Sequence, residues 1–412
     1  MEKKQKQQLI NRRDFVRVAG IGAGAGLLGM HAARGASQPA NQQPPKPIIQ
    51  GFDDTGNEAG ITKIWVPVSD RKIRVGLVGY GACRFSALFG FQDHPNVEVV
   101  AVSDLIPERC NQLAEHVKCN KKYPSLEKMV KDKTIEAIFI ATDAPSHAQH
   151  AMDALNHGKH VACAVPAVWG SLEDAERLYE TVKQTGLKYI MFETSMFHDT
   201  LYAMHTLYKA GHLGEIVYSE GEYYHYFATP LDSFNGWRVG LPPQYYPTHS
   251  NAYHLCVTGG SFTEVSCLGM PSIVDHLKPK NNRYKNPFGT EVALFRASEG
   301  GMSRMVVSWD TPGFGAEAGR VRGTRGSFYG QYQGLDVDLP DLSRPSLPSS
   351  VDAGGHGGSH GRLTDEFVSA ILQDRKPLID IDLSLNLSVS GIVAHQSALK
   401  NGEWMKIPQF KT

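Results

Sequence analysis

Residues 244–255, QYYPTHSNAYHL, carry phenol and imidazole groups at helical spacing. On a helix Tyr246, His249 and Tyr253 would share one face, because positions i, i+3 and i+7 lie on the same side. An imidazole titrates near neutral pH, and a positive charge lowers the pKa of a nearby phenol. We therefore predict Tyr246 and His249 as groups that transfer protons.

Other histidines have plainer interpretations. His254 fits a core hydrogen bond, and His225 fits a strand position among packing aromatics. His356 and His360 lie in a glycine-rich loop, where a loop tip competes with a role in a site. The six cysteines lie far apart and no histidine-carboxylate spacing is typical of a metal site, so we predict no metal.

A second chemical signal is Gly79-Tyr80-Gly81, between an apolar run and a helix-like stretch. Glycines at such a turn let the backbone approach a pyrophosphate at a helix N-terminus. Arg84 stands where a third glycine is usual, but Asp104, about 25 residues downstream, can accept both ribose hydroxyls. We predict NAD rather than NADP, since the carboxylate repels a 2′-phosphate. The alternative is a glycine turn with an aspartate cap.

The elements that would position these groups alternate between short β-branched runs and helix-length stretches, which predicts a parallel sheet with covering helices. The expected strands are residues 73–79, 97–104, 137–142, 160–166 and 189–193. The expected helices are 85–93, 107–118, 145–157 and 172–185. The fold class is α/β, with an N-terminal Rossmann-type doubly wound sheet.

Beyond Glu193 the pattern changes to a helix near residues 201–210, alternating strands, and helices near 362–373 and 385–399. This predicts a C-terminal α+β domain with a mostly antiparallel sheet. The boundaries we expect are 71–194 for the NAD-binding domain, 195–380 for a substrate-binding domain, and 381–412 for a helix and tail that pack back on the first domain.

Residues 1–36 resemble a twin-arginine export signal, with Arg12 and Arg13 before a short apolar run rich in glycine. Residues 37–70, rich in Pro, Gln and Gly, predict a linker. We expect a periplasmic or otherwise exported protein with no stable membrane insertion after signal cleavage. The alternative is an amphipathic surface helix, which the glycines disfavour.

The composition is that of a folded chain of 412 residues, with 42 basic and 42 acidic side chains. A formal net charge of zero gives no long-range field for a phosphate backbone, so we expect no nucleic acid partner. A small molecule is the expected ligand.

From residue 73 to about residue 410 the chain resembles the Gfo/Idh/MocA family, the relatives of glucose-fructose oxidoreductase and inositol dehydrogenase. The stretches that carry the resemblance are IATDAPSHAQHAMDALNHGKHV, FHDTLYAMHTLYKAGHLGEI and GHGGSHGRLTDEFVSAILQDRKPLIDID. The resemblance implies cofactor contacts from Gly79, Gly81, Ala82, Arg84, Asp104, Thr142, His147, Val165, Pro166 and Glu193. It implies a sugar pocket with His198, Tyr246, His249 and His356, and a homo-oligomer.

One departure bears on function. Most dehydrogenases of this family carry Glu-Lys-Pro after the fourth strand, where the lysine exchanges a proton with the hydroxyl that is oxidised. Here the run is Ala164-Val165-Pro166, and valine cannot hold a proton. Tyr-x-x-His at 246–249 resembles the NAD-dependent glycosidases of the same family, which also lack the lysine.

We expect an exported NAD-dependent enzyme that acts on a saccharide or glycoside by hydride transfer at a sugar hydroxyl carbon. Little free NAD exists outside the cytoplasm, which favours a redox-neutral outcome such as net glycoside hydrolysis or elimination. One alternative is a simple sugar or polyol dehydrogenase with net oxidation. Another is a non-catalytic NAD-binding sensor or binding protein.

Overall fold

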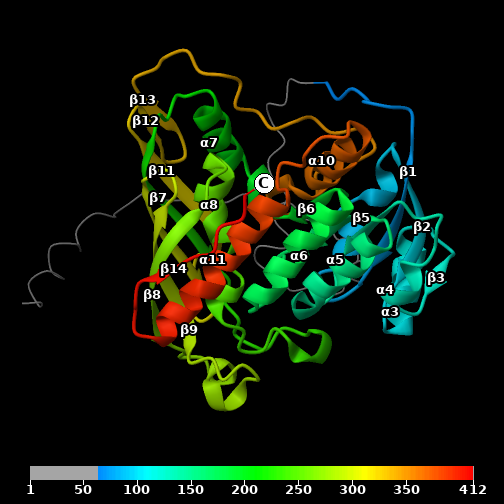
Figure 1. Ribbon diagram of the computed structural model, residues 1–412, viewed down its shortest axis with the longest axis horizontal. Helices are drawn as coiled ribbons and strands as arrows, with labels where there is room; N and C mark the ends of the chain where they lie inside the picture. Colours follow the sequence, from blue (N-terminus) through cyan, green and yellow to red (C-terminus); the bar gives the residue numbers. More distant parts are fainter. Residues whose placement is uncertain (1–63, 412) are drawn as a thin grey trace, which may run out of the picture. The chain divides into compact units, whose positions relative to one another are not determined.

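Short β-branched runs form a six-stranded parallel sheet in the computed structural model, which describes residues 64–411 (Figure 1). The strand order is β3-β2-β1-β4-β5-β6. The strands are β1 Ile73–Val78, β2 Val97–Ser103, β3 Lys122–Tyr123, β4 Ala137–Ile140, β5 His160–Ala164 and β6 Tyr189–Phe192. Five were predicted from the sequence. The two-residue edge strand β3 was not, because it is too short to show a pattern.

The helices of this first domain follow the predicted stretches, with one break. They are α2 Phe85–Leu88, α3 Pro107–His116, α4 Leu126–Met129, α5 His147–Asn156 and α6 Leu172–Thr185. The predicted helix 85–93 is wrong beyond Leu88, because Gly90 adopts φ 74° and ends the helical path. α6 begins where Ser171 accepts a hydrogen bond from the Asp174 amide, and it ends at Gly186, with φ 65°.

A second, eight-stranded sheet has the order β13-β12-β11-β7-β10-β9-β8-β14. Neighbouring strands pair antiparallel except β7 and β10, which are parallel. The strands are β7 Ile216–Tyr224, β8 Phe262–Pro271, β9 Phe288–Ala297, β10 Met302–Ser308, β11 Ala316–Gly323, β12 Gly326–Phe328, β13 Tyr332–Gly334 and β14 Met405–Lys406. The predicted α+β architecture is confirmed.

The helices of the second half are α7 Asp199–Lys209, α8 Thr248–Thr258, α9 Gly355–Gly358, α10 His360–Leu372 and α11 Ile381–Leu399. Single 3₁₀ turns complete the described chain: η1 Phe91–Asp93, η2 Ala144–Ser146, η3 Thr194–Phe197, η4 Phe234–Gly236, η5 Pro243–Tyr245, η6 Asp275–Leu277 and η7 Pro279–Asn281. α8 packs on β7 and β11.

The predicted helical face of Tyr246, His249 and Tyr253 is wrong at its first member. Tyr246 has φ −126° and ψ 55°, and α8 begins two residues later. The reason is Pro247, which has no amide hydrogen to donate and disfavours a helical conformation in the residue before it.

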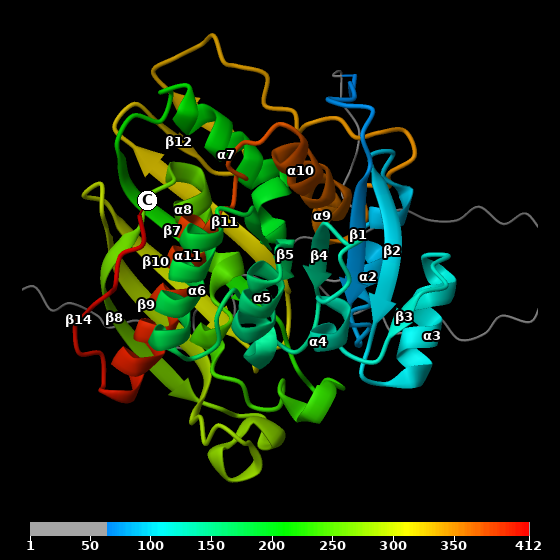
Figure 2. The same ribbon diagram turned by 45° about the vertical axis from the view of Figure 1, so that its right-hand side comes forward.

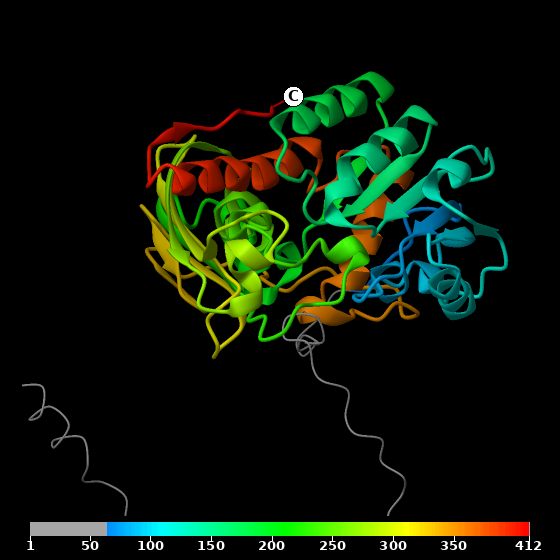
Figure 3. The same cartoon turned by 90° about the horizontal axis from the view of Figure 1, so that it is seen from below.

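Two C-terminal segments differ from the predicted domain boundaries. α10, assigned to the second domain, packs on the first: Thr364 Oγ1 donates to the Phe89 carbonyl over 2.7 Å, and Phe367 lies edge-on to Phe91. α11 contacts both domains, running along β8 and beside α6 (Figures 2 and 3). β14, in the tail, joins the second sheet rather than the first domain.

The predicted leader, residues 1–36, and most of the predicted linker lie outside the described residues. The linker's last residues are attached to the first domain, because Trp65 Nε1 donates to Asp365 Oδ1 over 2.9 Å and Asn96 donates to the Ser69 carbonyl. Within residues 64–411, no helix combines the length and apolar character needed to cross a membrane.

Gly221 of β7 allows the close approach of α8, which carries His249. A Cβ atom at Gly221 would overlap the Ser250 carbonyl and lie 2.7 Å from Met305 Sδ. We expect Gly221→Ala to destabilise the fold by about 3 kcal/mol, the upper range for overpacking, and to lower Tm in calorimetry.

The matched control is Gly211→Ala, where an added Cβ meets nothing within 4 Å but φ is +83°. Its expected cost is about 1 kcal/mol, from backbone strain alone. Equal losses of Tm in the two variants would contradict the packing argument.

Candidate active site

A crevice lies at the carboxyl ends of the first sheet's strands, where ligands bind in doubly wound folds. Gly79 follows β1 with φ 93°, and a Cβ there would overlap the Ala141 carbonyl beyond β4. Gly81 has open space where its Cβ would be, with nothing within 4 Å. The first glycine is therefore needed for the turn, and the second leaves room for a ligand.

Asp104 lies just beyond β2 and is held by two backbone amides. Oδ2 accepts from Tyr80 N over 2.6 Å, and Oδ1 accepts from Ile106 N over 2.8 Å. Each carboxylate oxygen retains a lone pair for a ligand hydroxyl. Arg84, in place of the third glycine, adopts the left-handed conformation with φ 50° at the start of α2. The glycine-like backbone thus survives with a basic side chain on the crevice wall.

His147 links two loops of the crevice instead of presenting a free ring nitrogen. Nδ1 lies 2.8 Å from the Pro166 carbonyl and Nε2 lies 3.2 Å from the Thr142 carbonyl. Burial lowers the pKa of His147. The Val165–Pro166 peptide that it supports is cis. His147 therefore fixes the loop that holds Val165 in the position of the family's lysine.

Eight of the ten residues predicted to contact the cofactor line the crevice: Gly79, Gly81, Ala82, Arg84, Asp104, Thr142, His147 and Val165. Pro166 does not line it, and its carbonyl bonds to His147 instead. Glu193 also lies elsewhere: it is fully buried and bonded to His249. Glu193 thus does not line the crevice, because its carboxylate is directed at the His249 imidazole, and its contact with the cofactor stays a prediction.

Tyr246 connects the crevice to a smaller cavity. It lines both, together with Ala164 and Val165, while His249 and His356 line only the smaller one. Burial raises the pKa of Tyr246 to about 12, although the guanidinium of Arg238 opposes the shift. In the protein alone Tyr246 is therefore a neutral hydrogen-bond donor at pH 7, and a lowered phenol pKa beside the positive nicotinamide ring stays a prediction.

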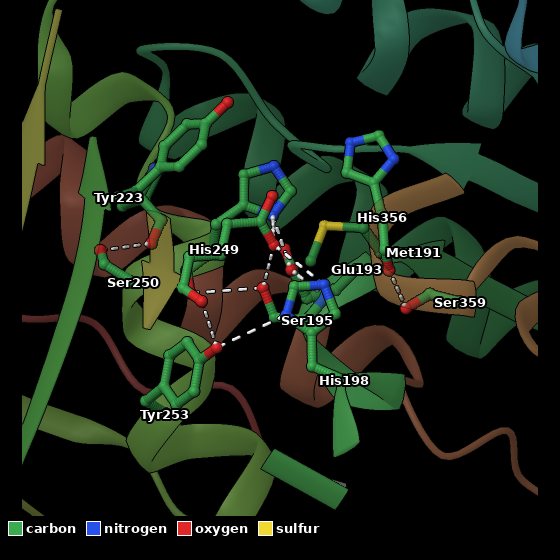
Figure 4. A network of polar contacts seen from close by, with 12 residues as sticks. Met191, Glu193, Ser195, His198, Tyr223, His249, Ser250, Tyr253, His356 and Ser359 are labelled. Atoms are coloured by element: carbon green, nitrogen blue, oxygen red, sulfur yellow. Dashed lines mark hydrogen bonds and ion pairs between the residues drawn. The ribbon is translucent and has the colours of Figure 1, made fainter. Parts of the chain in front are cut away.

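His249 is the charged group of the smaller cavity. Its ring lies beside the Glu193 carboxylate (Figure 4). Its Nδ1 lies 2.8 Å from Glu193 Oε1 and 3.6 Å from Glu317 Oε2. Burial disfavours the imidazolium, but the two carboxylates outweigh it and raise the pKa of His249 to about 9. The sequence suggested an imidazole that titrates near neutral pH, whereas the pKa of His249 lies above that range.

His356 and His198 lie on different sides of His249. The His356 ring, at 6.3 Å between centroids, lines the small cavity, and burial lowers the pKa of its imidazole well below the usual value. His198 lines neither cavity. Its Nε2 lies 3.4 Å from Glu317 Oε2, so the structure places His198 beside that carboxylate, and its contact with a sugar stays a prediction.

Two residues of this site were missed in the sequence. Arg238 lines the crevice, with its guanidinium carbon 4.2 Å from the Trp237 ring centroid and 5.6 Å from that of Tyr246. Glu317 comes from β11, where it shares the inward parity of Gly319 and the buried Val321. This alternation along the strand indicates that Glu317 faces inward, but only the fold shows that β11 packs against α8.

Donor atoms of Glu193, His249 and Glu317 lie within 4.8 Å of one another, a spacing that one cation could bridge. His249 itself supplies a positive charge when protonated. The absence of a metal stays a prediction. His254, by contrast, is fully buried between Ser219 and Glu299, as expected of a core histidine.

The crevice fits a dinucleotide: a glycine turn with open space beside Gly81, a carboxylate at the end of β2, and a doubly wound sheet below. This defines the class of protein as a nucleotide-binding α/β protein with an α+β partner domain. Residues 73–193 match the model of the oxidoreductase family with an NAD-binding Rossmann fold. Over this segment the chain is similar to the Gfo/Idh/MocA family, and the cofactor of the matched domain is NAD.

Curated relatives carry the name glycosyl hydrolase family 109. Protein 1 of Bacteroides fragilis is 30% identical over 195 residues, covering 43% of this chain and 41% of the relative. The matched segment thus spans less than half of that relative. The protein from Saccharopolyspora erythraea is 23% identical over 447 residues, covering 97% and 94% of the two chains.

Solved structures share the two-domain fold. An oxidoreductase domain protein from Kribbella flavida has TM-score 0.67 and 17% identity, covering 82% of this chain and all of its own. Scyllo-inositol dehydrogenase from Lactobacillus casei with NAD(H) and scyllo-inositol has TM-score 0.63 and 18% identity, covering 82% and 99%. At these identities the likeness establishes the fold.

Asp104 offers a test of cofactor choice. We expect Asp104→Asn to weaken NAD⁺ binding about tenfold, the value of one charged hydrogen bond. It should also raise relative affinity for NADP⁺, because the carboxylate no longer repels a 2′-phosphate. Titration calorimetry on cofactor-stripped protein measures both. Asp153→Asn, on α5 outside the crevice lining, is the charge-matched control; an unchanged NAD⁺ to NADP⁺ ratio in Asp104→Asn would refute the assignment.

Proposed function

We propose that the protein is an exported NAD-dependent enzyme that acts on a saccharide or glycoside at a sugar hydroxyl carbon, with a redox-neutral outcome. The observation that carries this proposal is the meeting of two cavities at Tyr246 and Val165. Tyr246 and His249 stand there beside a position where a lysine would otherwise exchange the proton. The name glycosyl hydrolase family 109 among the relatives supports the same reaction class.

The chain's own residues divide the work. Gly79 and Gly81 would admit the pyrophosphate, and Asp104 would bind the ribose hydroxyls. When bound, NAD supplies hydride acceptance and return at a sugar carbon. Tyr246 and His249 would exchange protons with the sugar, and His356 would orient a hydroxyl from the cavity wall. Val165 keeps the end of the crevice apolar.

A ketone formed on the sugar would acidify the neighbouring C–H bond, so the substituent at the anomeric carbon can leave by elimination. Addition of water followed by reduction gives net hydrolysis with no consumption of cofactor. A protein exported with its cofactor bound needs such a cycle. Export itself rests on Arg12 and Arg13 in the resemblance to a twin-arginine signal, and Arg12→Lys with Arg13→Lys should retain the protein in the cytoplasm.

A second candidate is a simple dehydrogenase with net oxidation. Structural neighbours favour it, including a levoglucosan dehydrogenase complexed with NADH and levoglucosan, at TM-score 0.65 and 17% identity over 82% of this chain. A homo-oligomer stays a prediction.

The two candidates differ in what they release. Purified exported protein is denatured to measure bound NAD by absorbance, and the native protein is incubated with chromogenic glycosides in deuterated water. Deuterium beside the anomeric carbon of the released sugar, with no net reduction of NAD, is the expected result. A keto sugar that accumulates with reduced cofactor would select the dehydrogenase, and bound NAD without any turnover would leave only a binding protein.

His249 is the most direct single-residue test. We expect His249→Ala to lower kcat about 100-fold or more, the value of a proton-transfer group, while bound NAD is retained, because His249 does not line the crevice. His157→Ala, an exposed histidine after α5, is the control. A kcat within a few-fold of the unmodified protein would discard the role.

A further inference from the structure

The His249 imidazole is held between carboxylates from both domains. Glu193 follows β6 of the first sheet, and Glu317 lies on β11 of the second. The exposed fractions of the three side chains are 4% for His249, 0% for Glu193 and 5% for Glu317. The pairing is therefore shielded from water, where electrostatic interactions are strong.

Backbone and hydroxyl groups fix both carboxylates. Ser195 donates its amide to Glu193 Oε1 over 2.9 Å and its hydroxyl to Glu317 Oε2 over 2.8 Å. Tyr253 donates its hydroxyl to the Glu317 carbonyl over 2.7 Å, which ties β11 to α8. Gly319 makes this approach possible, because a Cβ there would overlap the Tyr253 ring.

We propose that Glu317 is a positioning residue for His249. Glu193 accepts the hydrogen bond from Nδ1–H, Glu317 places a second carboxylate 3.6 Å from the same nitrogen, and Nε2 is then the nitrogen that exchanges a proton with the sugar in the small cavity. This inference rests on the proposed function for the identity of the proton donor and acceptor. The ring orientation and the charge of His249 are properties of the protein alone. A carboxylate that fixes the tautomer in this way also stabilises the imidazolium that forms.

The charge balance around His249 indicates the effect of Glu317. The titratable and charged groups that face its ring are Glu193, Glu317, His198, Tyr223, Tyr246, His356, His225 and Arg238. Burial lowers the pKa of His225 to about 3 and that of His356 well below its usual value, so both rings are neutral at pH 7. The carboxylates are the groups that favour the imidazolium, and Arg238 opposes it.

The charge of His249 sets the direction in which kcat/KM changes with pH. When His249 acts as the base that accepts the hydroxyl proton, kcat/KM rises with pH until the imidazolium of the free enzyme is lost. Removal of one carboxylate charge lowers the pKa of His249, so the ascending limb moves to lower pH. A structural role for Glu317 alone would lower activity without moving the limb.

The experiment compares Glu317→Gln with the unmodified protein in two measurements. NMR titration of ¹⁵N-histidine-labelled protein, with His249 assigned through His249→Gln, reports the pKa and the Nδ1–H tautomer without substrate. Glycoside kinetics from pH 5 to 10 report the ascending limb. We expect the pKa and the limb both to fall by about one pH unit in Glu317→Gln.

Glu299→Gln is the matched control. Glu299 lies 2.6 Å from Nε2 of His254, which is on the same helix as His249, and this pair lies outside both cavities. It should leave the His249 titration and the limb unchanged. An identical His249 titration in Glu317→Gln and the unmodified protein would overturn the inference. A shifted titration with no turnover of any glycoside would instead retain Glu317's effect on His249 and reject the proposed function.

Treatment with a chelator distinguishes a protonated His249 from a metal cation bound between the carboxylates. We expect unchanged activity and an unchanged His249 titration after exhaustive dialysis against EDTA. Activity lost on chelation and restored by Mn²⁺ would overturn the inference, because the carboxylates would then hold a metal in place of the imidazolium.

Discussion

Two carboxylates buried against each other must share a positive charge, and that requirement organises the centre of this molecule. Glu193 and Glu317 are almost fully withdrawn from water, and an unpaired buried carboxylate is costly. His249 lies between them and gains a raised pKa as a result. Because one carboxylate follows the first sheet and the other belongs to the second, the interaction also specifies how the two sheets meet. Glu193 keeps a lowered pKa because, despite burial, His249 and the Ser195 amide stabilise its charge.

This arrangement separates the crevice suited to a cofactor from the side chains suited to carry protons. The groups suited to a dinucleotide come from loops after β1, β2 and β4, while the groups that can carry protons come from α8 and the segment before it. Val165 lies in a loop whose shape His147 fixes by bonding the Pro166 carbonyl. The loop thus has a structural role, and the side chains suited to proton transfer lie in the neighbouring domain.

Local patterns predicted what local forces decide. The five longer strands of the first sheet follow from β-branched runs, and helix α6 follows from a helix-length stretch with apolar residues at helical spacing. The predicted helix after Gly81 is longer than the helix in the structure, because Gly90 adopts a left-handed conformation that ends the helix. Tyr246 was placed on a helix that Pro247 prevents from forming. Glu317 could not be found by spacing, because His249, with which it forms an ion pair, lies far earlier in the chain, and only the packing of β11 on α8 brings the two together.

Helix α11 lines neither cavity, but it contacts both the loop that follows Pro166 and the helix that carries His249. α11 is buried along most of its length, yet its serines face three different partners. Ser388 accepts the Ala167 amide just beyond Pro166, Ser390 accepts Asn251 of α8, and Ser397 accepts the Cys267 amide of β8. Each hydrogen bond satisfies a buried N–H donor, so a shift of the helix along its axis would leave several buried donors without an acceptor at once. α11 therefore connects the two domains through polar contacts, and this explains why a helix so apolar overall carries serine at the positions that meet buried N–H donors.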